Sequence, residues 1–107
     1  MKEPIWIPSP QRVRSANMTR FISFVNERHG TAFSGYDDLY RWSVTDIPAF
    51  WGDVWEFCGV IAARSFDRVV DDPGRMPGAR WFEGARLNFA ENLLRYRDER
   101  TAIIFRG

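Results

Sequence analysis

The sequence is short of the residue types on which many catalytic and metal sites depend. It holds one histidine, one cysteine and one lysine: His29, Cys58 and Lys2. A zinc site needs several His or Cys ligands at set spacings, and a lone cysteine cannot form a disulfide within its chain. The sequence therefore predicts no zinc centre and no internal disulfide, which fits a reducing, cytoplasmic environment.

Glycine clusters and long apolar runs are also missing. A phosphate-binding loop needs closely spaced glycines, usually with a lysine, whereas Gly78, Gly84 and Gly107 are scattered. No apolar run approaches the roughly 18 residues of a membrane-spanning helix, and the first ten residues lack the apolar centre of a signal peptide. We therefore expect no membrane partner.

Charge of one sign is not in excess, because 15 basic and 14 acidic side chains leave a net charge of +1. Residues 1–36 carry five basic and two acidic side chains, residues 37–72 three and eight, and residues 73–107 seven and four. A negative middle between positive ends indicates charge complementarity within the chain. It argues against nucleic acid as a partner.

Apolar and aromatic residues, in contrast, are plentiful. Of the 107 residues, 45% are hydrophobic and 16% aromatic, with five Trp and nine Phe. Such a composition excludes disorder, but a chain of this length forms one domain at most and buries only a modest core.

Hydrophobic periodicity predicts a mainly α chain, with about four short helices joined by long loops. Ser9 and Pro10 begin a short turn, and Asn17 is placed to cap the first helix. The second helix is signalled by Ser34, and the third begins near Pro48. The third should be the central packing element, with this apolar face: Phe50, Trp51, Val54, Trp55, Cys58 and Ile61.

The C-terminal third predicts loops, one more helix and two extended segments. Asn88, with Glu91 three residues later, resembles a capping box, so the fourth helix should run to about Tyr96. A short extended segment is expected near residues 68–70. The apolar run TAIIF, residues 101–105, is typical of a strand covered on both faces, and such a strand would be frayed, paired with 68–70, or paired with a second copy.

Isolated candidate groups have ordinary structural interpretations. We interpret His29 as a donor to the free carbonyls at a helix end, and Cys58 as a small core residue. The acid pairs Asp37–Asp38 and Asp71–Asp72 suit helix starts and turns better than acid–base catalysis, because adjacent helical residues do not face each other.

Four stretches carry a resemblance to a known family: NMTRFISFVN, YDDLYRWSV, FWGDVWEFCGV and MPGARWFEGARLNFAENLLR. They resemble the N-terminal region of acetoacetyl-CoA synthetases, which are acyl-adenylate-forming acid–thiol ligases. The Trp-Phe-x-Gly-x-x-Leu-Asn core is similar to the corresponding segment of acetyl-CoA synthetases, and the resemblance covers about residues 5–105. It is carried by these residues: Trp81, Phe82, Gly84, Leu87 and Asn88.

The resemblance implies a parent enzyme that uses ATP and magnesium to convert acetoacetate to an acyl-adenylate and then transfers the acyl group to coenzyme A. It implies no catalytic or metal-binding residue and no cofactor within these 107 residues, so the chain alone should be inactive. Residues 1–100 would form the helical N-terminal segment. Residues 101–107 would begin the large α/β adenylate-forming domain, which is the expected partner, and strand 101–105 would allow self-association in its absence.

Two uses of the segment around Trp81 stay open. As an attachment segment, it would use Gly78 and Gly84 for tight turns, and Trp81 and Phe82 as apolar anchors. A less favoured hypothesis places Arg80 or Arg86 near the phosphates of coenzyme A. The alternative to a ligase segment is a self-standing helical protein-interaction module without ligase activity.

Overall fold

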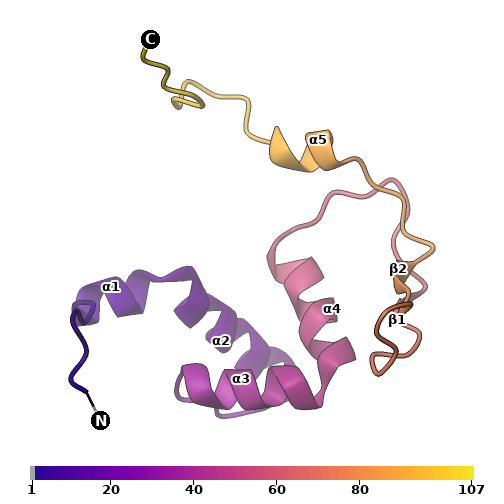
Figure 1. Ribbon diagram of the computed structural model, residues 1–107, viewed down its shortest axis with the longest axis horizontal. Helices are drawn as coiled ribbons and strands as arrows, with labels where there is room; N and C mark the ends of the chain where they lie inside the picture. The colour runs from indigo at the N-terminus through magenta and orange to yellow at the C-terminus, as the bar shows by residue number, and fades with distance from the viewer. Residues whose placement is uncertain (1) are drawn as a thin grey trace.

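The computed structural model describes residues 2–107, and it is mainly helical, as the sequence predicts (Figure 1). The elements in chain order are α1 (Pro10–Ser15), α2 (Asn17–His29), α3 (Tyr36–Thr45), α4 (Ile47–Phe57), β1 (Arg68–Val70), β2 (Trp81–Glu83) and α5 (Phe89–Leu93). Across the described part of the chain, no helix combines the length and the apolar character needed to cross a bilayer.

Helix starts follow the sequence in part. Ser9 accepts a hydrogen bond from the Arg12 amide and so caps α1, and Asp46 caps α4 by accepting one from the Ala49 amide. Asn17, expected to be a cap, is instead the first residue of α2, after Ala16 at the N-cap. Helix α3 starts at Tyr36, and its N-cap, Gly35, has no side chain to cap it. Ser34 is still bonded to this helix, because its amide and hydroxyl donate hydrogen bonds to the Asp38 carboxylate.

The core lies among α2, α3 and α4. Phe21 and Val25 on α2 and Leu39 on α3 are buried, and apolar side chains of α4 pack against them. Because α4 contacts α2, α3 and β1, its expected central place is confirmed. Its two faces differ, however, because Phe50, Val54 and Phe57 face the helical core whereas the two tryptophans face the other way.

Cys58 and Ile61 lie beyond the last residue of α4. The helix ends at Phe57, Cys58 is exposed at its C-cap, and Ile61 lies in the following linker. The prediction that Cys58 is a core residue is therefore wrong. Cys58 continues the 3.6-residue period of α4, since its conformation is helical and its amide bonds to the Val54 carbonyl, but it lies at the open edge of the helical core.

The extended segment at 68–70 is confirmed as β1, and its partner is β2. The two strands are antiparallel, with Arg68 opposite Glu83 and Val70 opposite Trp81, and an isolated bridge pairs Arg64 with Arg86. We call residues 64–86 the hairpin arm. The sequence predicted turns at Gly78 and Gly84 on either side of Trp81 but no strand between them, because three residues are too few to show a period of two.

The C-terminal part differs from expectation in two ways. Helix α5 is capped by Asn88 as predicted, since its side chain accepts a hydrogen bond from the Glu91 amide, but it ends at Leu93 rather than near Tyr96. Residues 101–107 form no strand and are exposed, which matches the frayed alternative and not pairing with 68–70. Within residues 2–107 no other segment pairs with this one, and its assignment to a strand of the following domain stays a prediction.

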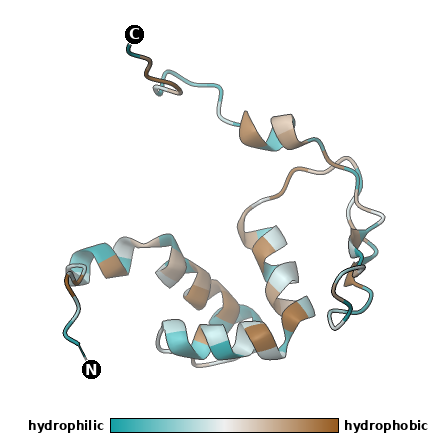
Figure 2. Cartoon of the chain, viewed as in Figure 1, coloured by the Kyte–Doolittle hydropathy of each residue, from teal (hydrophilic) through white to brown (hydrophobic). Residues whose placement is uncertain are grey.

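The whole chain is extended rather than compact. Its radius of gyration is 17.6 Å, whereas a compact chain of this length would have about 13 Å. Figure 1 shows α5 and the C-terminal residues running outward from the group formed by α1 to α4, and Figure 2 shows apolar residues along them. A chain of this shape leaves much of its apolar surface without a partner.

Candidate functional site

Aromatic contacts attach the hairpin arm to the outer face of α4. The ring centroids of Trp55 and Phe82 are 4.9 Å apart, and Phe66 lies edge-on to both rings, at 5.1 and 5.3 Å. A second contact joins Trp51 to Trp81 at 6.1 Å, again edge-on. Pairs of this kind contribute about 0.5–1.5 kcal/mol each beyond their burial, so the arm is held firmly against the helix.

The backbone at the centre of this aromatic cluster is unusual. Phe82 adopts a positive φ of 49°, a conformation that costs a non-glycine residue about 1–3 kcal/mol and persists where surrounding contacts impose it. Gly84 has φ +83°, and a Cβ there would collide with the Asp67 carboxylate and lie 2.6 Å from Arg64 Nη1. The predicted turn at Gly84 is therefore required by both φ and space.

The predicted anchors are unequally buried within this chain. Phe82 is half-buried between Trp55 and Phe66, whereas Trp81 keeps 44% of its surface exposed and Leu87 keeps 49%. Trp81 is therefore only partly covered by these 107 residues, and its role as an apolar anchor stays a prediction. Gly78 does adopt the expected turn conformation, with φ +113°.

Arg80 and Arg86 lie at opposite ends of the hairpin arm. The Arg80 carbonyl accepts a hydrogen bond from the amide of Asp71, the residue that follows β1. The Arg86 carbonyl accepts hydrogen bonds from the amides of Ala63 and Arg64, which precede β1. The Arg80 guanidinium lies 3.9 Å from Glu83 and is largely exposed. The arm thus separates the two arginines, and their proposed contact with coenzyme A phosphates stays a prediction.

A charged cluster joins the end of α2 to α4. Asp53, 2% exposed, lies 2.7 Å from His29 Nε2 and 3.3 Å from Arg28 Nε. Arg28 also bonds to the exposed Glu56, which lowers the pKa of that carboxyl below its usual range. His29 thus contacts a side chain of another helix rather than the free carbonyls we expected. Asp53 was not among the residues that the sequence singled out, and the only signal for it is an acidic residue in a mainly apolar helix.

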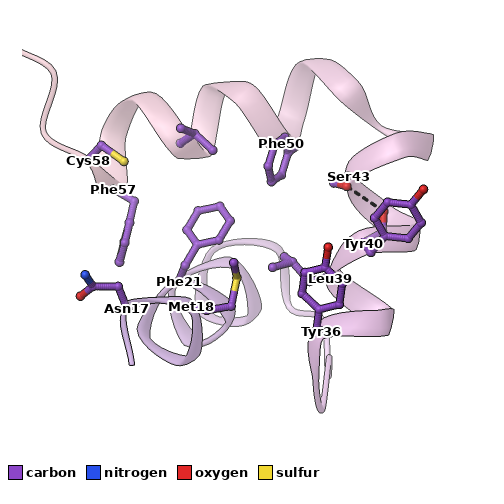
Figure 3. A pocket seen from close by; sticks show the side chains of 11 residues that line it. Asn17, Met18, Phe21, Tyr36, Leu39, Tyr40, Ser43, Phe50, Phe57 and Cys58 are labelled. Carbon is purple, nitrogen blue, oxygen red and sulfur yellow. Dashed lines mark hydrogen bonds between the residues drawn. The ribbon is translucent and has the colours of Figure 1, made fainter. Parts of the chain in front are cut away.

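An apolar groove opens between α2, α3 and α4 (Figure 3). Its volume is about 340 Å³, and its lining includes Phe21, Leu39 and Phe50 together with the exposed Met18 and Tyr40. No acid, histidine or arginine side chain lines it within the described chain. The groove can therefore accept an apolar group, but it offers no acid–base pair for a reaction.

The acidic, histidine and cysteine side chains of residues 2–107 are not arranged as ligands for a magnesium ion. No three His, Cys, Asp or Glu side chains in that range are grouped to hold a metal. The carboxylates of Asp71 and Asp72 bond to backbone amides of their own turn. The Asp71 carboxylate accepts hydrogen bonds from the Asp72 and Arg80 amides, and the Asp72 carboxylate accepts one from the Gly74 amide. We therefore place no catalytic step on this chain.

Comparison with known proteins gives the same family as the sequence motifs. The family model described as acetyl-coenzyme A synthetase N-terminus matches residues 36–93, from α3 to the end of α5. The chain belongs to this family. The match contains the hairpin arm and all five residues of the core around Trp81.

Individual relatives cover almost the whole chain. It is 45% identical over 106 residues to an acetoacetyl-coenzyme A synthetase of Rhizobium meliloti, covering 99% of this chain and 16% of that protein. It is 44% identical over 94 residues to a malonamoyl-CoA synthetase of Penicillium aethiopicum, covering 87% and 13%. Among solved structures, an acetoacetyl-CoA synthetase from Streptomyces lividans matches with a TM-score of 0.76 and 44% identity, over 84% of this chain and 14% of that one.

This family member is thus short beside its relatives. It spans about one-sixth of their length or less. The family match and the shared fold concern the N-terminal region, so the activity of the whole ligases is a matter of proposal for this chain.

Proposed function

We propose that this chain is the N-terminal structural segment of an ATP-dependent acetoacetate–CoA ligase. The observation that carries the proposal is the match to relatives named acetoacetyl-CoA synthetase, 41–45% identical over 89–99% of the chain in two cases. The parent enzyme would use ATP and magnesium to activate acetoacetate as an acyl-adenylate and then transfer the acyl group to coenzyme A. Its chemistry would reside in the large adenylate-forming domain.

The role of the chain itself is to fold against that domain and support it. Three properties favour this role: the small core, the extended shape and the apolar side chains left exposed along the C-terminal part. A self-standing helical module would normally bury such side chains, because exposed apolar patches promote association. The alternative module without ligase activity is therefore the weaker proposal.

The test uses what we call the joined ligase, in which residues 1–107 are fused in frame to the Rhizobium meliloti relative beyond its matched region. Product formation is followed as AMP release that requires acetoacetate, ATP and coenzyme A, with acetate as the comparison acid. We expect activity from the joined ligase and none from the 107-residue chain. Thioester formation by the short chain, or a body that is stable and fully active without the segment, would refute the proposal.

A further inference from the structure

A second hollow runs along one face of α2, beside the helical core. Its volume is about 670 Å³, within the roughly 300–1,000 Å³ of small-molecule sites. Residues three or four positions apart share one side of a helix. On α2 this side of the hollow is formed by these residues: Thr19, Ile22, Ser23 and Asn26.

Two further segments wall this hollow. We call residues 4–9, at the N-terminal end of α1, the N-terminal strap (Figure 1); it contributes Trp6 and Pro8. The loop before α3 contributes Phe33. Asn26 holds that loop in place, because its side chain donates to the Phe33 carbonyl and accepts from the Phe33 amide, both at 2.9 Å. This wall is therefore formed in advance, so a ligand would not have to order it.

The polar groups of the hollow leave one cation without a partner. The serine and threonine hydroxyls along it already donate to oxygen atoms of the chain; they belong to Thr19, Ser23 and Ser34. Arg12 is the one charged residue among the described residues of the lining. Its guanidinium lies over the Trp6 ring, 5.8 Å from the centroid, and no ion pair in the described part of the chain involves it.

We propose that this hollow binds a small monocarboxylate with an apolar chain, whose carboxylate pairs with Arg12 and whose chain lies against Ile22 and Phe33. Charge complementarity carries the choice of ligand, because a guanidinium donates two parallel hydrogen bonds to a carboxylate, and no acid of the lining competes for it. The walls beside this cation are apolar, so they suit a hydrocarbon chain better than a second charge.

The site is separate from the proposed ligase chemistry. Apart from Tyr36, its lining residues precede the stretch 36–93 that matches the family model. All three of its walls lie within the 107-residue chain, so the chain itself is the protein to test.

Octanoate titrated into the 107-residue chain tests the site, with NMR of the backbone amides and of the Trp6 indole as the readout. We expect saturable shifts at Trp6, Ile22 and Asn26. Octan-1-ol and octylammonium carry the same chain without a carboxylate. Each should bind at least roughly 10-fold more weakly than octanoate, because neither forms the charge-assisted bond to Arg12. Acetate has the carboxylate without the chain and should also bind more weakly.

Two arginine variants separate recognition by Arg12 from general attraction to basic charge. Arg12→Gln should raise the Kd for octanoate roughly 10-fold and leave the Kd for octan-1-ol unchanged. Arg14→Gln is the matched control, because Arg14 lies on the same helix but does not line the hollow; it should change neither Kd. Ser23→Trp places a ring in the hollow from an exposed position and should abolish binding of both ligands without lowering the melting temperature.

Equal Kd values for octanoate and octan-1-ol, or equal effects of Arg12→Gln and Arg14→Gln, overturn the proposal. Shifts confined to residues 89–105 overturn it too, since they would place binding on the exposed apolar side chains of the C-terminal part. Binding to the 107-residue chain but not to the joined ligase would show that the hollow is covered in the enzyme, and would likewise refute the site. A joined ligase that makes no acetoacetyl-CoA but binds octanoate through Arg12 would refute the proposed function alone.

Discussion

Gly84 determines the turn of the hairpin arm because it has no Cβ atom. Its φ of +83° belongs to the region that favours glycine, and the space beside its Cα is filled by Asp67 and Arg64. We predict that Gly84→Ala lowers the free energy of unfolding of the chain by about 1–3 kcal/mol, measured by urea denaturation.

Gly52 provides the matched control for this substitution. It lies within α4, and an added Cβ would make an ordinary 3.5 Å contact with Val69. Since alanine is the better helix former, Gly52→Ala should be neutral or stabilising by up to about 1 kcal/mol. If Gly84→Ala and Gly52→Ala have the same free energy of unfolding, the positive φ at Gly84 does not contribute to stability.

Trp81 tests attachment against ligand binding. Because Trp81 is 44% exposed in this chain and its ring touches Trp51 at one edge, we predict that Trp81→Ala lowers the free energy of unfolding of the 107-residue chain by about 2 kcal/mol, less than the 3–5 kcal/mol of a fully buried ring. The same substitution in the joined ligase tests ligand binding. The KM for coenzyme A should not change. A variant of unaltered stability with a raised KM for coenzyme A would support the ligand-site hypothesis, and Arg80→Ala and Arg86→Ala in the same assay would show which arginine is involved.

At the scale of the elements, the hairpin arm is closed at its loop end by Asp71. The Arg80 amide lowers the pKa of Asp71 below its ordinary 3.8, with further lowering from the Asp72 amide, Arg75 and Arg68. A carboxyl with a depressed folded-state pKa stabilises the fold above its unfolded pKa, and this stabilisation is lost as the pH falls through the folded value.

We therefore predict that Asp71→Asn flattens the acid side of the stability profile. The wild-type chain should lose stability between about pH 5 and pH 2, and the variant should lose less over the same range. Urea midpoints measured across this range provide the comparison, with the pH 7 values as the reference for each protein. Parallel profiles for the two proteins would show that Asp71 does not stabilise the arm through its charge.

For the whole molecule, the exposed apolar side chains of α5 and of residues 103–105 predict association of the isolated chain. We expect light scattering to show a mass that rises with the concentration of the 107-residue chain, and deletion of residues 101–107 to reduce that rise, since the deletion removes three strongly exposed apolar side chains. Ile103→Ser with Phe105→Ser should have the same effect without shortening the chain. Monodisperse monomers in both forms, with unchanged melting temperature, would favour an independent module instead.

The sequence by itself determined the helical class, the family and several local structural features. Ser9 and Asn88 are located at helix starts because a short polar side chain there reaches a free amide one turn further along, and this depends on local sequence alone. The sequence also located β1 and the turn at Gly84. These features depend on residues within a few positions of each other, so a linear pattern suffices to find them.

Tertiary structure alone decided how those elements are used. The pairing of β1 with β2, the contact of buried Asp53 with His29, and the contact of Trp55 with Phe82 join residues 11 to 27 positions apart. The orientation of α5 follows from Asn92 bonding to Ile61, a distant backbone group that no periodicity reveals. Periodicity shows that a helix has an apolar side, but only packing decides whether that side faces the chain's own core or another domain.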